Sequence, residues 1–181
     1  QTILKLAAQT TEETHGYFDI WHNGTFNPSG IVKGWAIDEA ASLLYMEGFR
    51  NFFVDAGGDV QVYGRNAQGE PWTVGICNPF NLQQIVKKIA LDERGIATSG
   101  SYMRGAHIYN PRDEADQLDE IVSLTVIGPD VLEADRMATA AFAMGRMGVY
   151  FIEALPDFEA YMIDRSGQAT MTTHFSDYVC A

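Results

Sequence analysis

The chain has 181 residues, of which 46% are hydrophobic and 20% are charged, a composition typical of one globular domain with a buried core. Its 24 acidic and 12 basic side chains give a net charge of −12, which argues against binding to nucleic acid or to an anionic membrane surface. No apolar run approaches the roughly 18 residues of a membrane-spanning helix, so we expect no transmembrane segment in this chain.

The first part of the chain has the periodicity of two helices. Ile3, Leu6 and Ala7 recur at helical spacing and predict an amphipathic helix over residues 2–13. A turn signal at residues 27–30 follows, with Ser29 as a candidate helix start. Residues 35–47 are apolar enough to predict a mostly buried helix that ends at Gly48.

Most of the remaining chain alternates short extended runs with turns. The pattern predicts strands at residues 49–54, 60–63, 72–77, 85–91, 94–98, 121–127, 158–164 and 168–172. One further helix is expected over residues 132–145, where small residues indicate close packing against another backbone. Because helices and hairpins are interspersed, we predict a single α+β domain over residues 1–181, with a largely antiparallel or mixed sheet and flanking helices.

Two groups of side chains suggest chemistry at a phosphate or a metal. Asp135 and Thr139 are four residues apart and share one helix face, and their oxygens are of the kind that Mg²⁺ takes. The alternative is that Asp135 stabilises a helix start while Thr139 bonds to its own turn. Lys33 lies beside a glycine turn at a helix start, where a phosphate is favoured, although no nucleotide P-loop motif is present.

Other candidate residues are less specific. His107 follows a polar turn and is either a base that works near neutral pH or a hydrogen-bonded structural residue. The Gly57-Gly58-Asp59 turn lets a backbone approach a ligand but is also an ordinary turn sequence. Cys77 and Cys180 match no metal-binding spacing and neither demand nor exclude a disulfide.

Taken together, these pieces resemble the ApbE family of flavin transferases over residues 16–178. The resemblance is carried by five segments in the order in which that family has them: SGIVKGWAIDEA, VDAGGDVQVYG, PWTVGICNP, IATSGSYMRGAHIYNP and SLTVIGPDVLEADRMATAAFAMG. It implies an ApbE-like (T-fold-like) fold and an enzyme that uses Mg²⁺ and FAD. Such an enzyme transfers FMN to a threonine or serine hydroxyl of a target flavoprotein and releases AMP. The target is expected at or outside the cytoplasmic membrane, and the location of this chain is expected to be periplasmic or at the cell surface.

The resemblance also assigns roles to single residues. Lys33 matches a lysine near the FAD diphosphate, and His107 matches the proposed base for the acceptor hydroxyl. The expected metal ligands are the carbonyl of Gly30 and the side chains of Asp135 and Thr139. Asp38 and Asp59 match acids that line the flavin-nucleotide site.

Two departures from the family accompany the resemblance. The N-terminal Met-Gly-Thr block that helps to hold the flavin nucleotide is absent from this chain, and the segment between Asp19 and Gly30 is short, as in a compact subtype. We therefore expect the domain to lack its N-terminal segment and FAD binding to need that segment. Two alternative functions stay open: a hydrolase that splits FAD into FMN and AMP, and a non-catalytic FAD-binding or assembly protein.

Overall fold

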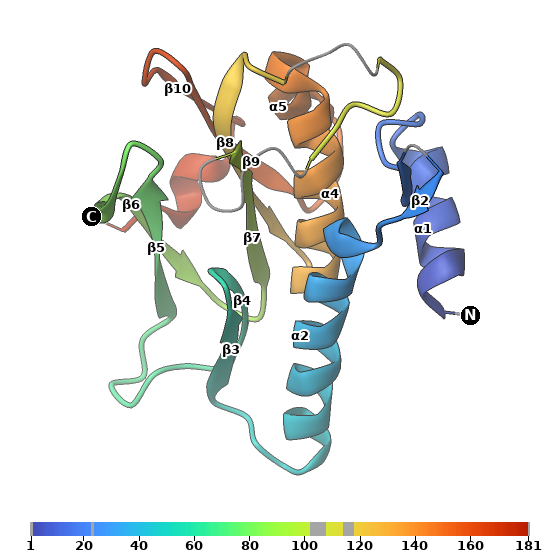
Figure 1. Cartoon of the computed structure of the whole chain (residues 1–181). Helices are drawn as coiled ribbons and strands as arrows, with labels where there is room; N and C mark the ends of the chain where they lie inside the picture. Colours follow the sequence, from blue (N-terminus) through green and yellow to red (C-terminus); the bar gives the residue numbers. More distant parts are fainter. Residues whose placement is uncertain (1, 23, 102–107, 114–117, 181) are drawn as a thin grey trace.

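The structure is a computed structural model that describes residues 2–22, 24–101, 108–113 and 118–180 (Figure 1). Its helices are α1 (Thr2–Glu13), α2 (Ser29–Met46), α4 (Val131–Ala143) and α5 (Gly148–Glu153), with 3-10 turns η1 (Gly145–Met147) and η2 (Phe175–Tyr178). Within these residues, no helix combines the length and the apolar character needed to cross a membrane. Cys77 and Cys180 are both free thiols.

A six-stranded sheet forms the centre of the molecule, with the strand order β10-β9-β8-β7-β4-β3. Its strands are β3 (Phe52–Ala56), β4 (Asp59–Tyr63), β7 (Gly95–Gly100), β8 (Ile121–Gly128), β9 (Glu159–Asp164) and β10 (Ala169–Met171). Two separate hairpins consist of β1 (Trp21–His22) with β2 (Thr25–Phe26), and of β5 (Trp72–Asn78) with β6 (Asn81–Leu91). Neighbouring strands pair antiparallel throughout, which confirms the predicted α+β fold.

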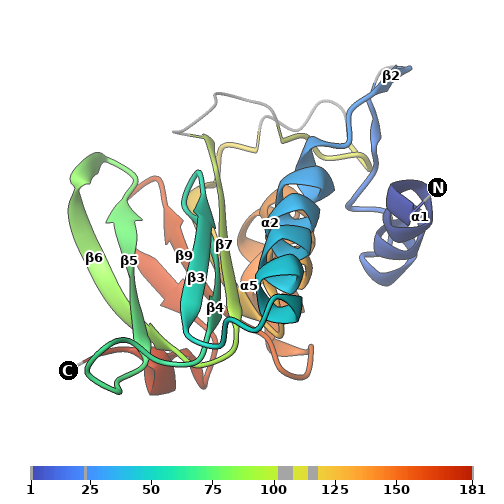
Figure 2. The same ribbon diagram turned by 90° about the horizontal axis from the view of Figure 1, so that it is seen from below.

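The elements are stacked in layers on the two faces of this sheet (Figure 2). Helices α2, α4 and α5 cover one face, with α1 outside them, and the β5–β6 hairpin lies on the other. One apolar cluster, which includes Leu124, Met137 and Phe142, fills the space between the sheet and the helices. A second cluster, which includes Val62, Ile89 and Phe175, joins the other face of the sheet to the hairpin and the C-terminal turn.

Helix α4 is the most deeply buried helix of the fold, because ten of its residues are buried. Its alanines let it lie close to the sheet on one side and to α2 on the other, as the small residues of this segment predicted. The helix begins at a capped end, where the Asp130 side chain accepts the Glu133 amide at 2.8 Å. Asp135 and Thr139 are therefore held in the interior of the domain, on a rigid element.

The structure corrects the prediction for the second helix. It begins at Ser29, the candidate helix start, directly after Pro28, and so extends beyond the predicted apolar span of residues 35–47. The apolar pattern did not extend over residues 29–34 because Gly30 and Gly34 are poor helix formers, whereas packing against α4 favours them here. Its second half is also not mostly buried, since Leu43 and Met46 are 58% and 73% exposed.

Several other elements differ from the prediction, among them β3, which runs over Phe52–Ala56 rather than over residues 49–54. Strand β6 begins at Asn81 rather than at residue 85, because it pairs with β5 up to the turn, and its first residues are exposed. Strand β7 continues through Ser99 and Gly100, which were predicted to lie in a turn, because these residues pair with β8. Helix α5 was not predicted.

Candidate active site

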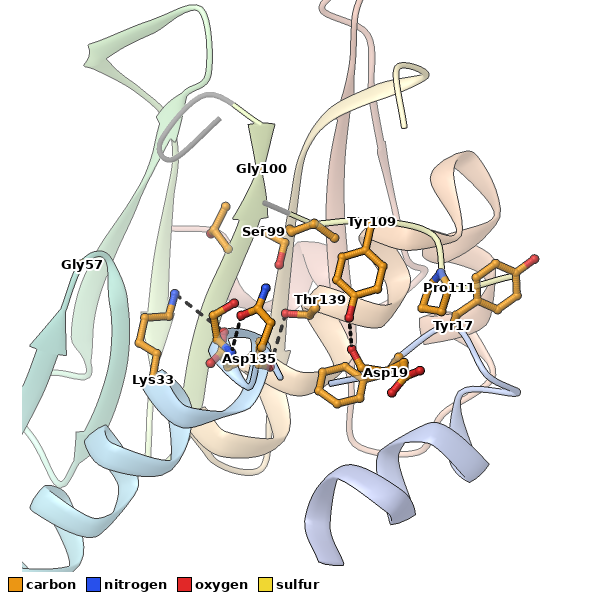
Figure 3. Close-up of a pocket in the computed structure, with 16 residues that line it drawn as sticks. Tyr17, Asp19, Lys33, Gly57, Ser99, Gly100, Tyr109, Pro111, Asp135 and Thr139 are labelled. Atoms are coloured by element: carbon orange, nitrogen blue, oxygen red, sulfur yellow. Dashed lines mark hydrogen bonds and ion pairs between the residues drawn. The ribbon is translucent and has the colours of Figure 1, made fainter. Parts of the chain in front are cut away.

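A pocket opens at the N-terminal end of α2, where α2, α4 and the end of β7 meet. Its walls also include residues 17–19, the β3–β4 turn and residues 108–111 (Figure 3). The enclosed volume formed by the described residues is about 60 Å³. Small-molecule pockets usually measure some 300–1,000 Å³. This volume therefore suits an ion with part of a phosphate group, and the rest of a dinucleotide would lie outside it.

The base of the pocket is formed by the contact between α2 and α4. Gly30 and Gly34 lie one helical turn apart on α2 and face Thr139 and Asp135, which lie one turn apart on α4. A Cβ added to Gly30 would lie 2.7 Å from Thr139 Cγ2, and one added to Gly34 would lie 2.7 Å from Asp135 Cβ. Only glycine permits this approach, so the two helices touch at the point where the candidate ligands lie.

Hydrogen bonds connect the same four residues. The Gly34 amide donates to Asp135 Oδ2 at 2.8 Å, and the Thr139 hydroxyl donates to the Gly30 carbonyl at 3.4 Å. In an uninterrupted α-helix the Gly34 amide would donate to the Gly30 carbonyl. Asp135 therefore competes with the Gly30 carbonyl for the Gly34 amide proton. The same hydrogen bond fixes the orientation of the Asp135 side chain. The arrangement brings the carbonyl of Gly30 on α2 together with the hydroxyl of Thr139 on α4, and Asp135 lies on the same face of α4.

Lys33 connects two buried carboxylates beside this contact. Its Nζ lies 2.5 Å from Asp59 Oδ2 and 3.7 Å from Asp135 Oδ1. Asp59, at the start of β4, is 1% exposed and also accepts the Thr98 amide through Oδ1 at 3.2 Å. Its Oδ2 receives no well-directed hydrogen bond from the described residues, although Lys33 lies close to it. One lysine thus faces two carboxylates in a place that water hardly reaches.

Burial dominates the protonation of this pair. It raises the pKa of Asp135 to about 7, and the negative charge of Asp59 adds to the shift, against the opposing effects of Lys33 and the Gly34 amide. Burial also raises the pKa of Asp59 by more than Lys33 lowers it. Burial thus disfavours the charged form of both carboxylates, and a proton or a cation beside them would be stabilising.

The residues at the base of the pocket fit a hard divalent cation. Asp135, Thr139 and Gly30 supply a carboxylate, a hydroxyl and a carbonyl oxygen, which are the donors that Mg²⁺ prefers, and water and phosphate oxygens usually complete its coordination. The poorly satisfied oxygen of buried Asp59 adds negative charge that such an ion would neutralise. Among the described residues no group of three or more His, Cys, Asp or Glu side chains is placed to hold a metal. A cation here would therefore need the hydroxyl and main-chain oxygens in addition to the Asp135 carboxylate.

The opposite wall of the pocket is closed by a bond between two distant segments. The Tyr109 hydroxyl donates to the main-chain carbonyl of Asp19, which joins residues 108–111 to residues 17–19 (Figure 3). Burial raises the pKa of Tyr109 to about 12, so this hydroxyl keeps its proton at neutral pH. Thr98 and Ser99, at the end of β7, add hydroxyl groups to the lining.

The structure brings together five of the seven residues predicted from the sequence. Gly30, Lys33, Asp135 and Thr139 line the pocket, and Asp59 lies beneath Lys33. Lys33 lies within the helix, in its second turn, rather than at its start, and Gly30 belongs to the first turn.

The other two predicted residues are not joined to this group. Asp38 lies beside a separate groove between α1 and α2, where burial and the nearby Asp130, Glu39 and Glu133 raise its pKa. The structure does not bring Asp38 to the pocket, and its role in nucleotide binding stays a prediction. His107 lies outside the described residues, so its role also stays a prediction.

Sequence reasoning missed Gly34, Asp19 and Tyr109. The signal for Gly34 was present, because Gly30 and Gly34 repeat the spacing of Asp135 and Thr139. No local pattern points to the Tyr109–Asp19 bond, which joins residues 90 positions apart.

Comparison with known proteins identifies relatives of this chain. The model of the ApbE family matches residues 22–162. The FAD:protein FMN transferase of Salmonella typhimurium is 32% identical over 153 residues, which cover 80% of this chain and 44% of the relative. The protein of the same name from Escherichia coli is 31% identical with the same coverage. The chain thus spans less than half the length of these curated relatives.

Solved structures show the same fold. The ApbE protein of Thermotoga maritima superposes with a TM-score of 0.88 at 22% identity, covering 99% of this chain and 77% of the other. The flavin transferase ApbE of Vibrio cholerae superposes with a TM-score of 0.84 at 23% identity, covering 98% of this chain and 75% of the other. The family match spans most of the sequence and the fold agrees over nearly all of it, so this chain belongs to the ApbE family.

Proposed function

We propose that this chain carries the catalytic core of a Mg²⁺-dependent FAD:protein FMN transferase, which attaches FMN from FAD to a threonine or serine hydroxyl of a target flavoprotein and releases AMP. The observation that carries the proposal is the convergence of Lys33, Asp59, Asp135, Thr139 and the Gly30 carbonyl at the base of one pocket. Its support from relatives is the 32% identity to a protein of that activity. The same proposal places the acceptor flavoprotein at or outside the cytoplasmic membrane.

The reaction requires one bond to form and one to break at phosphorus. The acceptor oxygen bonds to the phosphorus that carries riboflavin, the bond from that phosphorus to the bridging oxygen breaks, and AMP leaves with that oxygen. The hydroxyl proton passes to a base, the role that the family resemblance gives to His107. Phosphoryl transfer needs mainly positioning and neutralisation of charge, so few groups must react covalently.

The residues of the pocket have separable tasks in this scheme. Lys33 supplies positive charge toward the diphosphate and balances the carboxylates beneath it. Gly30, Asp135 and Thr139 would hold the Mg²⁺, which when bound neutralises charge on the phosphate oxygens. The bond from Tyr109 to Asp19 keeps two walls of the pocket together.

Incubation with FAD and Mg²⁺, with and without an acceptor flavoprotein, tests the proposal. AMP release that depends on the acceptor, together with acceptor protein heavier by one FMN group, supports the transferase. AMP release at the same rate without acceptor shows a hydrolase instead. FAD binding without AMP release under either condition shows a binding protein.

A further inference from the structure

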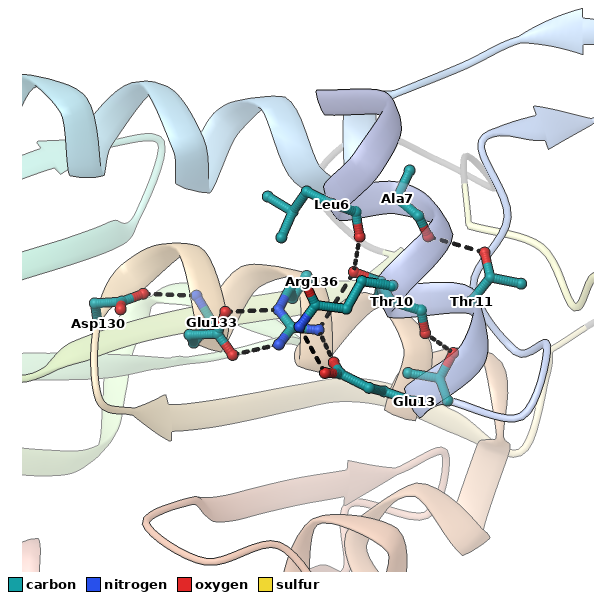
Figure 4. Close-up of polar contacts among 10 residues, drawn as sticks. Leu6, Ala7, Thr10, Thr11, Glu13, Asp130, Glu133 and Arg136 are labelled. Carbon is teal, nitrogen blue, oxygen red and sulfur yellow. Dashed lines mark hydrogen bonds and ion pairs between the residues drawn. The ribbon is translucent and has the colours of Figure 1, made fainter. Parts of the chain in front are cut away.

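Arg136 is a buried charged residue that the proposed chemistry does not use. It follows Asp135 on α4, and its side chain is only 4% exposed. Its side chain points toward α1 (Figure 4), whereas Asp135, one residue earlier, contacts Gly34 of α2. Arginine is rarely buried to this degree without full hydrogen bonding, so its partners indicate its role.

The guanidinium group is bound on both sides. Glu133, on the same helix, takes it in a bidentate arrangement, with Nε donating to Oε1 at 2.8 Å and Nη2 donating to Oε2. On the other side Nη1 donates to Glu13 Oε2 and, at 3.3 Å, to the Thr10 hydroxyl. The planar fork of arginine, oriented by Glu133, therefore fixes the last turns of α1 against α4.

The end of α1 leads directly into the pocket wall. Glu13 is followed by Thr14 and the turn residues His15 and Gly16, both with positive φ, and then by Tyr17, Phe18 and Asp19 of the lining. Phe18 is 3% exposed and packs in the apolar cluster between α1, α2 and α4. A shift of α1 relative to α4 would thus move this wall relative to Asp135 and Thr139.

Stability alone does not account for such a residue. Removing one partner of a buried ion pair is costly when the other charge stays buried, but Glu13 and Glu133 are 38% and 25% exposed and can be solvated without Arg136. A methionine at position 136 could extend the neighbouring cluster of Leu6, Leu132 and Met144. A methionine could not form the hydrogen bonds that Arg136 donates to Glu13 and Thr10.

We infer that Arg136 is a positioning residue, which holds the wall of residues 17–19 at a fixed place relative to Asp135 and Thr139 through its bonds to α1. Its effect on catalysis rests on the proposed function, whereas its effect on the wall does not. Arg136→Met should therefore loosen residues 14–20 and weaken FAD binding, while the sheet and α4 stay intact.

Amide hydrogen exchange of the whole chain tests the structural half of the inference. In Arg136→Met the amides of residues 14–20 should exchange about tenfold faster or more, while those of β7 and β8 keep their protection. Glu13→Gln, which keeps Arg136 and Glu133 paired, should give the same pattern with a smaller change. Because it leaves α4 unaltered, it tests the link to α1 even if Arg136→Met disturbs the whole fold. Arg65→Met removes an exposed ion pair with Asp92 and serves as the control that leaves residues 14–20 unchanged.

FAD binding and kinetics with Mg²⁺ test the functional half. Displacement of a wall that contacts the substrate should raise the KM for FAD on the order of tenfold, with kcat within about twofold of the wild type. Unchanged exchange in residues 14–20 overturns the inference, as does faster exchange with an unchanged KM and FAD affinity. If the wild type neither binds FAD nor releases AMP even in a form extended by an N-terminal segment, the proposed function fails, and hydrogen exchange alone decides whether Arg136 holds the wall.

Discussion

Helix α4 has two polar faces that differ in how well their charges are matched. Toward α2, buried Asp135 shares Lys33 with buried Asp59, and Asp59 Oδ2 lacks a well-directed hydrogen bond. Toward α1, the single charge of Arg136 meets two glutamates that are 25% and 38% exposed, with hydrogen bonds on both sides. The first face carries buried negative charge that is poorly compensated, and the second has ordinary, satisfied partners.

This difference separates a site that can receive a ligand from a contact that holds the fold. A buried carboxylate with a raised pKa favours a proton or a cation, and such perturbed groups cluster at functional sites. A bidentate arginine with partly exposed partners needs no further ligand. The two faces are therefore expected to respond differently to substitution, activity being lost on the first and local order on the second.

The largest expected effect is that of Asp135→Asn. The amide keeps the shape of the side chain and can still accept the Gly34 amide proton, but it removes the negative charge. We expect FMN transfer to fall on the order of 10²- to 10³-fold, as when one stabilising group is removed from a transition state. Excess Mg²⁺ should restore part of the rate, as measured by AMP release.

Asp135→Ala provides the comparison for this change. It removes the oxygens as well as the charge, so added Mg²⁺ should restore less of its activity. Anomalous scattering from crystals soaked with Mn²⁺ would locate the ion directly. Full activity of Asp135→Ala in the presence of a chelator, or an ion bound elsewhere, would show that this face of α4 is not a metal site.

Gly34→Ala tests whether the close contact between the helices matters. The new Cβ would lie 2.7 Å from Asp135 Cβ and 3.0 Å from its Oδ2, and part of this contact cannot be relieved without moving α4. Overpacking of this kind costs about 1–3 kcal/mol of unfolding free energy, and we expect activity to fall with it. Ala36→Ser, at an exposed position of the same helix, is the matched control in denaturant unfolding. Equal stability of the two variants would mean that α2 has room to move.

The face toward α2 was largely predictable from the sequence, and the reason is its spacing. Asp135 and Thr139 repeat at four residues on a helix whose small side chains indicated close packing, and the structure confirms both the helix and the packing. The antiparallel sheet was predictable as well, because hairpins with turn residues between them specify local pairing. The Gly57-Gly58 turn is one example, with both glycines in the left-handed region.

The face toward α1 could not have been read from local patterns. Arg136 and Glu13 lie 123 residues apart, and neither residue belongs to a sequence motif that predicts contact with the other. The apolar pattern of α2 did not include Gly30 and Gly34 for a related reason, because these glycines are favoured by packing against α4, which forms only on folding. Intrinsic propensity and periodicity describe local preferences, whereas these features depend on contacts between distant segments.

Thr139→Val should lower activity less than Asp135→Asn or Asp135→Ala. The substitution preserves the shape and removes one neutral oxygen, which contributes less to a hard cation than a carboxylate does. We expect activity to fall about tenfold, which corresponds to roughly 1.4 kcal/mol. The loss should diminish as Mg²⁺ is raised, in a titration of the initial rate against metal concentration. A loss as large as that of Asp135→Asn would instead assign the hydroxyl a direct part in the reaction.

The smallest effect is expected at Glu13, on the face toward α1. Burial opposes ionisation of Glu13, but hydrogen bonds from Gln9 and Arg136 outweigh it and lower the pKa. The ionised form is thus favoured in the folded state, so its contribution is complete above the ordinary glutamate pKa of about 4.3 and is lost as the pH falls through the lowered value. Because Glu13 is 38% exposed, we expect less than about 1 kcal/mol. Urea unfolding of the wild type and Glu13→Gln at pH 7 and near pH 3 measures it. The difference in unfolding free energy should shrink toward acid pH, and a difference that stays constant or grows would show that Arg136 does not depend on the charge of Glu13.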